Sequence, residues 1–140
     1  MTPKTNAEIA RFTAECFNTR DFRAAIPYLD DDLEWTEVAN GRVFRGPEGC
    51  IEEYEGWARA FPDGKVEITN MVASGDNVVV EMLVTGTNTG PMMGPDGTEL
   101  PPSGKATVMN LCDVMLFKNS KVISGRSYFD LDTLRRQLEE

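Results

Sequence analysis

The chain has 140 residues, which corresponds to one domain built around a single hydrophobic core. Its 14 basic and 23 acidic residues give a net charge of −9, which repels nucleic acid and anionic lipid surfaces. It contains no histidine, which excludes histidine-dependent catalytic triads and the usual nitrogen ligands of zinc, copper and non-haem iron. Acid–base chemistry must therefore come from carboxylates, tyrosine, lysine or water.

The sequence shows neither a membrane segment nor a secretion signal. No apolar run approaches the roughly 20 residues that span a bilayer, and the first residues lack a charged region followed by a hydrophobic one. Cys16, Cys50 and Cys112 are widely spaced and odd in number, which is typical of reduced, structural cysteines. We therefore expect a cytoplasmic protein with no metal site.

Three helices are predicted in the first half of the chain. A Thr-Asn-Ala-Glu sequence with capping-box spacing opens the first, over residues 5–19, where apolar residues recur at helical intervals. A second, short helix is predicted over residues 21–28. A Gly-Pro pair opens the third, over residues 46–61, whose apolar stripe includes Tyr54.

The strands come mainly after these helices. Residues 33–38 alternate, with Leu33, Trp35 and Glu37 on one side, and an Asn-Gly turn then favours a small hairpin. The acidic run at residues 30–32 is interpreted as a solvated turn. Four longer strands are expected to form an antiparallel meander, over residues 65–73, 77–87, 105–117 and 121–129.

A Gly/Pro-rich segment, residues 88–104, separates the two halves of this meander. It is longer than an ordinary hairpin loop and carries Met92 and Met93, so we expect a flap near a pocket. Helices first and a curved sheet second indicate an α+β layer architecture, in one domain covering residues 1–140.

The end of the last strand carries Asp130-Leu131-Asp132-Thr133, which matches the DxDxT motif of aspartate-dependent phosphatases. That motif requires a whole nucleotide-binding-like fold after it, whereas only seven residues follow Thr133 here. We therefore predict that Asp130 or Asp132 caps a C-terminal helix.

The order of these elements resembles that of the SnoaL-like polyketide cyclases, in the nuclear-transport-factor-2-like superfamily of cone-shaped α+β folds. The sequences GTNTG at 86–90, LFKNSKVISGRSYFD at 116–130 and LRRQL at 134–138 carry this resemblance. The YFDL segment is also similar to limonene-epoxide hydrolase. The resemblance implies that the three helices of the first half pack on the concave face of the sheet, with a conical pocket between them. It also implies a homodimer packed through the outer face of the sheet.

The positions matched to the catalytic residues of these families have changed residue type. The acid–base aspartate of the last strand falls on Ser127, and the pocket histidine of the cyclases falls on Asp113. The catalytic positions of the epoxide hydrolases fall on Leu83, Thr85, Trp35 and Glu37. This chain therefore lacks both families' standard catalytic sets.

Strand alternation gives an independent check on this polar pair, and the resemblance to the family implies that the strand face which carries it lies inside the pocket. A hairpin turning at residues 118–120 places Asp113 opposite Ser127. Asp113 shares its strand face with Met109, Leu111 and Met115, and burial there would raise the pKa of its carboxyl. The alternative is that Asp113 bonds Ser127 or Arg126 and only orders the sheet.

Glu81 and Glu37 are the next candidates for acid–base roles. Glu81 would instead be a solvent-facing strand residue if the other face of its strand is buried. Trp35 is either core or an aromatic wall for a flat substrate.

These residues predict a cofactor-independent cyclase or isomerase for a small apolar or aromatic, carbonyl-bearing substrate. In this hypothesis Asp113 moves the proton, Ser127 and Asn88 donate hydrogen bonds to oxygen, and the Met92-Met93 flap excludes water. The alternatives are a non-catalytic ligand-binding protein of the same fold, and epoxide opening by Glu37, Glu81 and Asp113. Further substrate contacts are expected from Trp35, Tyr54, Leu83, Met109, Leu111, Met115 and Phe129.

The opposite sheet face is expected to form the homodimer contact, because it is too apolar to stay solvated. It carries Val108, Cys112, Val114, Leu116, Val122 and Tyr128.

Overall fold

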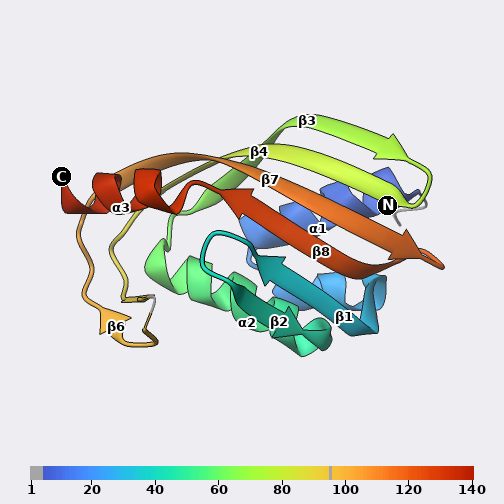
Figure 1. Ribbon diagram of the computed structural model, residues 1–140, viewed down its shortest axis with the longest axis horizontal. Coiled ribbons are helices and arrows are strands. Elements are labelled where there is room, and N and C mark those ends of the chain that lie inside the picture. Colours follow the sequence, from blue (N-terminus) through green and yellow to red (C-terminus); the bar gives the residue numbers. More distant parts are fainter. Residues whose placement is uncertain (1–4, 95) are drawn as a thin grey trace.

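The computed structural model describes residues 5–94 and 96–140 (Figure 1). Four helices lie in this part of the chain: α1 (Asn6–Thr19), the 3₁₀ helix η1 (Phe22–Tyr28), α2 (Gly46–Ala60) and α3 (Leu131–Glu139). They confirm the predicted helices to within a residue or two. The second is a 3₁₀ helix with Pro27 inside it, and a proline cannot donate the hydrogen bond that a longer α-helix needs.

The described strands form one large sheet and a small hairpin. The sheet has the order β2-β1-β8-β7-β4-β3, and its neighbours are antiparallel except β1 and β8, which are parallel. The predicted four-stranded meander is thereby confirmed. The sheet contains β1 (Leu29–Glu37), β2 (Arg42–Arg45), β3 (Lys65–Ser74), β4 (Asn77–Thr87), β7 (Ala106–Lys118) and β8 (Lys121–Phe129), and the hairpin contains β5 (Met92–Met93) and β6 (Glu99–Leu100).

The acidic run at residues 30–32 is part of β1, so its interpretation as a turn is wrong. The strand pairs with β8 at Leu29, and the pairing resumes only at Glu34 after a register shift. The three aspartates occupy this shift, where their polar side chains interrupt the buried pattern without ending the strand.

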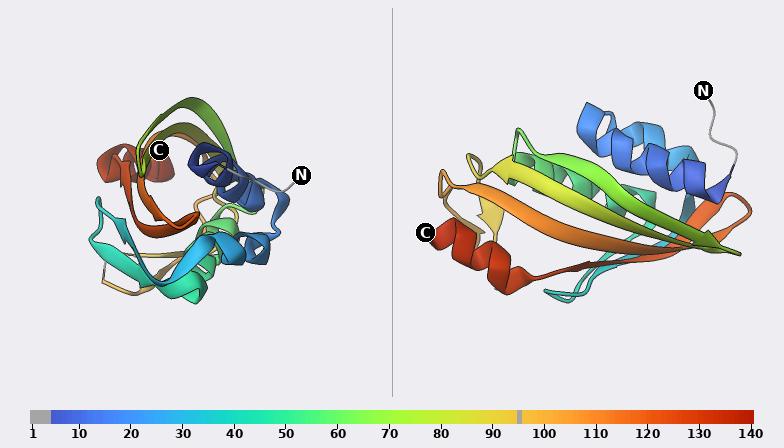
Figure 2. Two further views of the ribbon diagram at one scale, coloured as in Figure 1. Left: turned by 90° about the vertical axis from the view of Figure 1, so that its right-hand side faces the viewer. Right: turned by 90° about the horizontal axis from the view of Figure 1, so that it is seen from above.

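The sheet curves into an open half-barrel, and α1 and α2 lie across its open side (Figure 2, left). Helix α1 begins where the Thr5 hydroxyl accepts a hydrogen bond from the Glu8 backbone N–H at 3.1 Å. It buries Ile9, Ala10 and Cys16 against the sheet. The concave face of the sheet and these two helices therefore enclose the main core.

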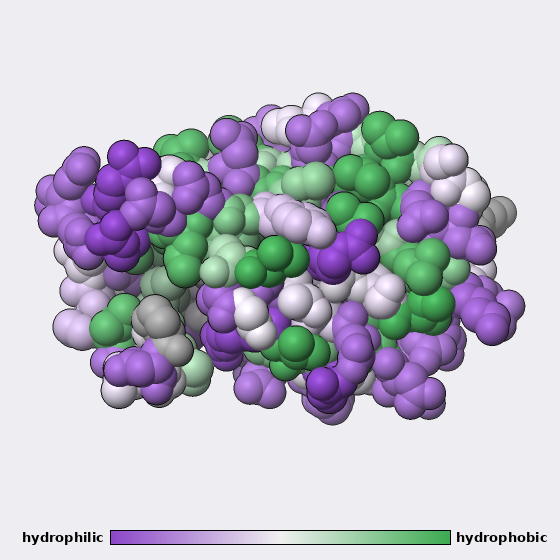
Figure 3. Space-filling view, viewed as in Figure 1, coloured by the Kyte–Doolittle hydropathy of each residue, from purple (hydrophilic) through white to green (hydrophobic). Residues whose placement is uncertain are grey.

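The outer face of the sheet keeps several apolar side chains exposed, which lie among polar ones in Figure 3. Val108 on β7 is 55% exposed, and Val72, Leu116 and Tyr128 are also exposed. Val122 is buried, so its assignment to this face is wrong. The register of β7 and β8 shifts between Leu116 and Phe117, and this shift turns Val122 inward opposite Phe117.

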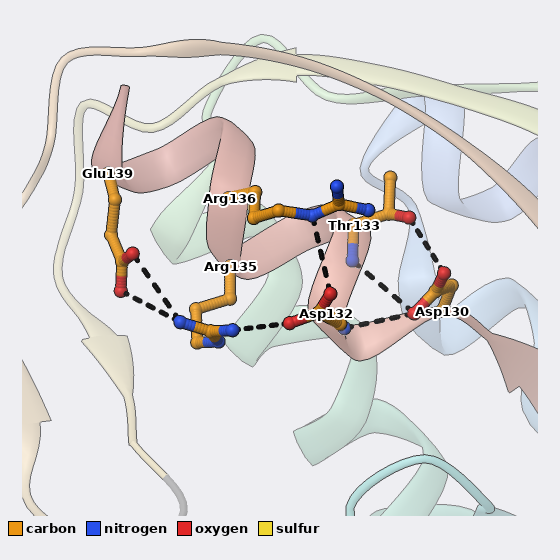
Figure 4. A network of polar contacts seen from close by, with 6 residues as sticks. All are labelled: Asp130, Asp132, Thr133, Arg135, Arg136 and Glu139. Atoms are coloured by element: carbon orange, nitrogen blue, oxygen red, sulfur yellow. Dashed lines mark hydrogen bonds and ion pairs between the residues drawn. The ribbon is translucent and has the colours of Figure 1, made fainter.

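Helix α3 begins at the predicted aspartate cap (Figure 4). The Asp130 carboxylate accepts hydrogen bonds from the backbone N–H groups of Asp132 and Thr133, at 3.0 and 3.3 Å. Asp132 forms ion pairs with Arg135 and Arg136 along the helix surface. The DxDxT sequence is therefore a helix start, and Leu134 is the buried residue of α3.

None of the helices in the described residues is both long and apolar enough to cross a membrane.

Candidate functional site

A cavity lies between the concave face of the sheet and helices α1 and α2. The cavity, together with the open space at its mouth, has a volume of about 1180 Å³. Its wall is mostly apolar, and the described residues that form it include no Lys or Arg. The ionisable carboxyl groups of that wall are Glu37, Glu53 and Asp113. A cavity of this kind suits a small, largely apolar ligand.

Asp113 and Ser127 lie directly opposite each other on β7 and β8, as strand alternation predicts. The Ser127 hydroxyl donates a hydrogen bond to the Asp113 carboxylate at 2.7 Å. The same hydroxyl oxygen accepts a hydrogen bond from the Trp35 indole N–H at 2.9 Å. The single hydroxyl hydrogen of Ser127 is therefore donated to Asp113. This hydrogen bond fixes the orientation of the Asp113 carboxyl group.

Burial raises the pKa of the Asp113 carboxyl from 3.8 to about 7. The hydrogen bond from Ser127 lowers this pKa and the nearby charge of Glu37 raises it, but burial is the largest cause. A carboxyl with a pKa near neutral pH can both accept and return a proton, so the site is suited to general acid–base chemistry.

Gly125 on β8 makes room for the indole ring that holds Ser127. A Cβ atom at this position would overlap the six-membered ring of Trp35. The absence of a side chain at Gly125 therefore lets Trp35 lie flat on the sheet and reach Ser127.

Glu37 forms a second polar centre on the cavity wall and is only 1% exposed. One of its carboxylate oxygens accepts a hydrogen bond from the Trp57 indole N–H at 2.7 Å. The other accepts from the Asn40 side-chain amide at 3.0 Å. These two N–H donors compensate for the water that a buried carboxylate loses.

Glu53 on α2 also lines the cavity, and sequence reasoning missed it. Burial is the largest cause of its strongly raised pKa, followed by the charge of Glu37 and a hydrogen bond between the two carboxyl groups. Its side chain keeps partial exposure because it borders the cavity. Its position in the sequence could have indicated this, because Glu53 lies three residues after Cys50 and four before Trp57. Residues at this spacing share one face of a helix.

Nine of the fourteen predicted site residues line the cavity. They come from the hairpin strand, from α2 and from the two central strands of the sheet. They are Trp35, Glu37, Tyr54, Met109, Leu111, Asp113, Met115, Ser127 and Phe129. Tyr54 also donates a hydrogen bond to the backbone oxygen of Thr13 at 3.1 Å, which ties α2 to α1.

Glu81 and Leu83 do not line the cavity, because the opposite face of β4 points inward. Asp113 pairs with Val80, and residues paired across antiparallel strands share a face. Glu81 therefore lies on the outer side, where it accepts a hydrogen bond from the Asn70 amide at 2.9 Å. Alternation alone could not reveal this, because no tight turn sets the register of β4 against β7.

Asn88 is buried but lies outside the cavity wall, where it orders the loop. Its side-chain amide donates to the backbone oxygens of Ala60 and Gly90, both at 3.0 Å, and its side-chain oxygen accepts from the Ser103 N–H. The side-chain amide of Asn88, which was expected to donate a hydrogen bond to substrate, is therefore already used within the protein.

Met92 and Met93 also lie outside the cavity wall. Met92 packs on the cluster formed around Phe61 and Leu134, at the end of the cavity near α3. Met93 is 53% exposed on the small hairpin. Neither side chain reaches Asp113 in this structure.

Over residues 5–94 and 96–140, no group of three or more Cys, Asp or Glu side chains is arranged to hold a metal ion. The polar side chains on the cavity wall include three carboxyl groups and the hydroxyl groups of threonine, tyrosine and serine residues.

Comparison with known proteins adds information on family and fold. Residues 7–138 match the family model described as SnoaL-like polyketide cyclase. Among curated protein sequences, none matches the chain significantly.

Solved structures also resemble this one closely. A Jannaschia sp. CCS1 protein assigned to the SnoaL-like polyketide cyclases has a TM-score of 0.84 at 22% identity, covering 95% of this chain and 90% of that one. IdmH from Streptomyces antibioticus, assigned as a polyketide cyclase, has a TM-score of 0.79 at 20% identity, with coverage of 98% and 100%. A Catenulispora acidiphila protein with a ketosteroid isomerase-like fold scores 0.79 at 17% identity, with coverage of 96% and 95%. At these identities the likeness establishes the fold.

Proposed function

The chain belongs to the SnoaL-like polyketide cyclase family, and from this premise we propose that it catalyses a cofactor-independent cyclisation or isomerisation of a small carbonyl compound. The observation that carries the proposal is Asp113, a buried carboxyl held by Ser127 on the wall of an apolar cavity. In the proposed reaction its carboxylate removes a proton from the carbon next to the carbonyl and later returns it.

Asp113 stands at the position matched to the cyclases' pocket histidine, opposite the position matched to their aspartate, and in this proposal it takes over the acid–base role. Its raised pKa supports this role, because a carboxyl that titrates near pH 7 is a stronger base than an ordinary aspartate. Ser127 acts as a positioning residue, since its only hydrogen is donated to Asp113.

The charge of the wall argues against an anionic substrate. Three carboxyl groups and no Lys or Arg line the cavity in the described part of the chain, so a free carboxylate ligand would find repulsion and no counter-ion. Trp35, Met109 and Phe129 offer flat or flexible apolar contact. We therefore propose a neutral, apolar compound whose reactive group is a ketone or a similar carbonyl.

The carboxylate set first considered for epoxide opening does not meet in one place. Glu37 and Asp113 line the cavity, whereas Glu81 lies on the outer face of β4. A ligand-binding protein without catalysis remains the competing function, and the following experiment separates it from an enzyme.

The test is deuterium exchange into 2-tetralone, an apolar bicyclic ketone, followed by proton NMR in D₂O. The wild-type protein is expected to accelerate loss of the protons next to the carbonyl, with a rate that rises as the Asp113 carboxyl ionises through about pH 7. Asp113→Asn should lose this acceleration. Asp76→Asn changes an exposed aspartate in the β3–β4 turn and should keep it.

Exchange equal to that of buffer alone would favour a binding protein over an enzyme. Acceleration that survives in Asp113→Asn would remove this residue from the mechanism.

We also propose a homodimer that covers the outer face of the sheet. Val72, Val108, Leu116 and Tyr128 leave apolar surface exposed on three strands of that face. Sedimentation at micromolar concentration should show a dimer, and Val108→Glu should shift it toward monomer. A wild-type chain that sediments as a monomer would refute this interface.

A further inference from the structure

The cavity contains a pair of carboxyl groups, Glu37 and Glu53, whose chemistry the proposed role of Asp113 does not use. Glu37 comes from β1 and Glu53 from α2, so the pair joins the sheet to the helix that covers it (Figure 1). Trp57, one helical turn after Glu53, donates its indole N–H to Glu37. Glu53 and Trp57 lie one turn apart on the same face of α2, and both contact Glu37.

The two members of the pair have unequal environments. Both oxygens of Glu37 accept N–H hydrogen bonds, from Trp57 and from Asn40. Over the described residues, the Glu53 carboxyl receives no hydrogen bond from a backbone or side-chain N–H; its polar contact is the Glu37 carboxyl. Hydrogen bonds from N–H groups stabilise a carboxylate, so the negative charge belongs on Glu37.

The surrounding charges favour the same assignment. Two adjacent carboxyl groups in an apolar wall cannot both ionise without strong repulsion, and one proton shared between them removes it. Asp113 adds negative charge from across the cavity, and Arg42 opposes it from β2. The ionisable groups facing Glu53 are Glu37, Asp113 and Arg42, with Cys50 and Tyr54 beside it on α2.

We infer that Glu53 carries a proton in the resting protein, where its O–H group bonds Glu37. When substrate binds, this O–H group turns to donate its hydrogen bond to the carbonyl oxygen, and Glu37 keeps its charge and the N–H donors of Trp57 and Asn40. This inference rests on the proposed function, and it adds an oxygen-recognising group to the proton-carrying one. It also restricts the substrate to one that presents an oxygen acceptor towards α2.

The proton balance of the two carboxyl groups is simple. Asp113 takes a proton from carbon, and the electron pair of that C–H bond moves into the carbonyl, whose oxygen becomes negative. Glu53 holds this oxygen by its O–H group, in a place where water is scarce. When Asp113 returns the proton to carbon, the oxygen loses its charge and the O–H group of Glu53 is unchanged.

The resting protonation can be measured without any substrate. In protein labelled with ¹³C at glutamate carboxyl carbons, one resonance should keep the chemical shift of a neutral acid at pH 7, and it should disappear in Glu53→Gln. In Glu37→Gln the same resonance should titrate at lower pH, because the neighbouring charge is gone. Glu52→Gln alters an exposed glutamate on the same helix and should leave it unchanged.

Oxygen recognition can be measured with 2-tetralone labelled with ¹³C at its carbonyl. In the wild-type protein the bound carbonyl resonance should move downfield of its position in an apolar solvent, as a hydrogen-bonded ketone does. Glu53→Leu should abolish that displacement, and Glu53→Gln, which keeps an N–H donor, should retain part of it. A purely structural role would leave the displacement the same in all three proteins.

Three results would overturn the inference: no glutamate resonance of a neutral acid at pH 7, a neutral acid that belongs to Glu37, or a ketone carbonyl unaffected by Glu53→Leu. None of them depends on catalysis. If Glu53 meets both expectations and deuterium exchange is absent, the proposed function fails while the oxygen site stands.

Discussion

Replacing Asp113 with asparagine is expected to make the protein more stable at high pH. The substitution keeps the shape of the side chain and an oxygen that accepts the Ser127 hydrogen bond, but it removes the charge. In the wild-type protein, ionising Asp113 places a negative charge in an apolar wall near Glu37. The asparagine variant cannot undergo this ionisation.

The size of the effect follows from the pKa of the carboxyl. Burial raises it from 3.8 to about 7, and at about 1.4 kcal/mol per pKa unit this interval corresponds to about 4 kcal/mol. The folded state holds the proton more tightly than the unfolded chain, so stability falls as pH rises through this interval and levels off above pH 7. About 3 kcal/mol of the loss is expected between pH 5 and pH 9.

The assay is urea unfolding of the wild-type protein and Asp113→Asn at pH 5 and pH 9. The difference in the free energy of unfolding between the two proteins should change in favour of the variant by about 3 kcal/mol. Asp76→Asn, at an exposed turn, should give nearly the same difference at both pH values. A difference for Asp113→Asn that does not change with pH would show that the carboxyl is not buried in an apolar site, and it would refute the reasoning.

Three further changes test individual contacts. Ser127→Ala should raise the pKa of Asp113 above about 7 in a ¹³C NMR titration, because the lost hydrogen bond lowers that pKa. It should also cost about 1–3 kcal/mol, since the Trp35 indole N–H loses its acceptor; an unchanged titration would contradict the contact. Gly125→Ala should displace the indole of Trp35 and cost about 1–3 kcal/mol, visible in the near-ultraviolet circular dichroism spectrum, and an unaltered spectrum would argue against their close packing. Asp130→Ala should cost about 1 kcal/mol and speed amide hydrogen exchange in α3, whereas exchange at the wild-type rate would mean that the cap contributes nothing.

Local patterns in the sequence were sufficient for most of the elements and for one side of the site, but not for the start of β1 or for the β5–β6 hairpin. Capping residues, Gly-Pro and Asn-Gly pairs and the change of hydrophobic period set where helices and strands begin, because these signals act within a few residues. Antiparallel pairing of β7 and β8 across a short turn predicted Asp113 opposite Ser127. The structure has these two residues paired, beyond the register shift between Leu116 and Phe117.

The rest of the site depended on contacts between residues far apart in the chain. The inward face of β4 follows from its pairing with β7 across a long loop, and the alignment with the family placed Glu81 and Leu83 on the wrong side. The register shift beside Phe117 turned Val122 inward, and no local signal marks it. The helical spacing of Glu53 could indicate the inward face of α2, but only the packing of α2 over the sheet places this carboxyl on the cavity wall beside Glu37. The ionisation of a carboxyl depends on how much water and charge surround it, and only the folded chain brings those surroundings together.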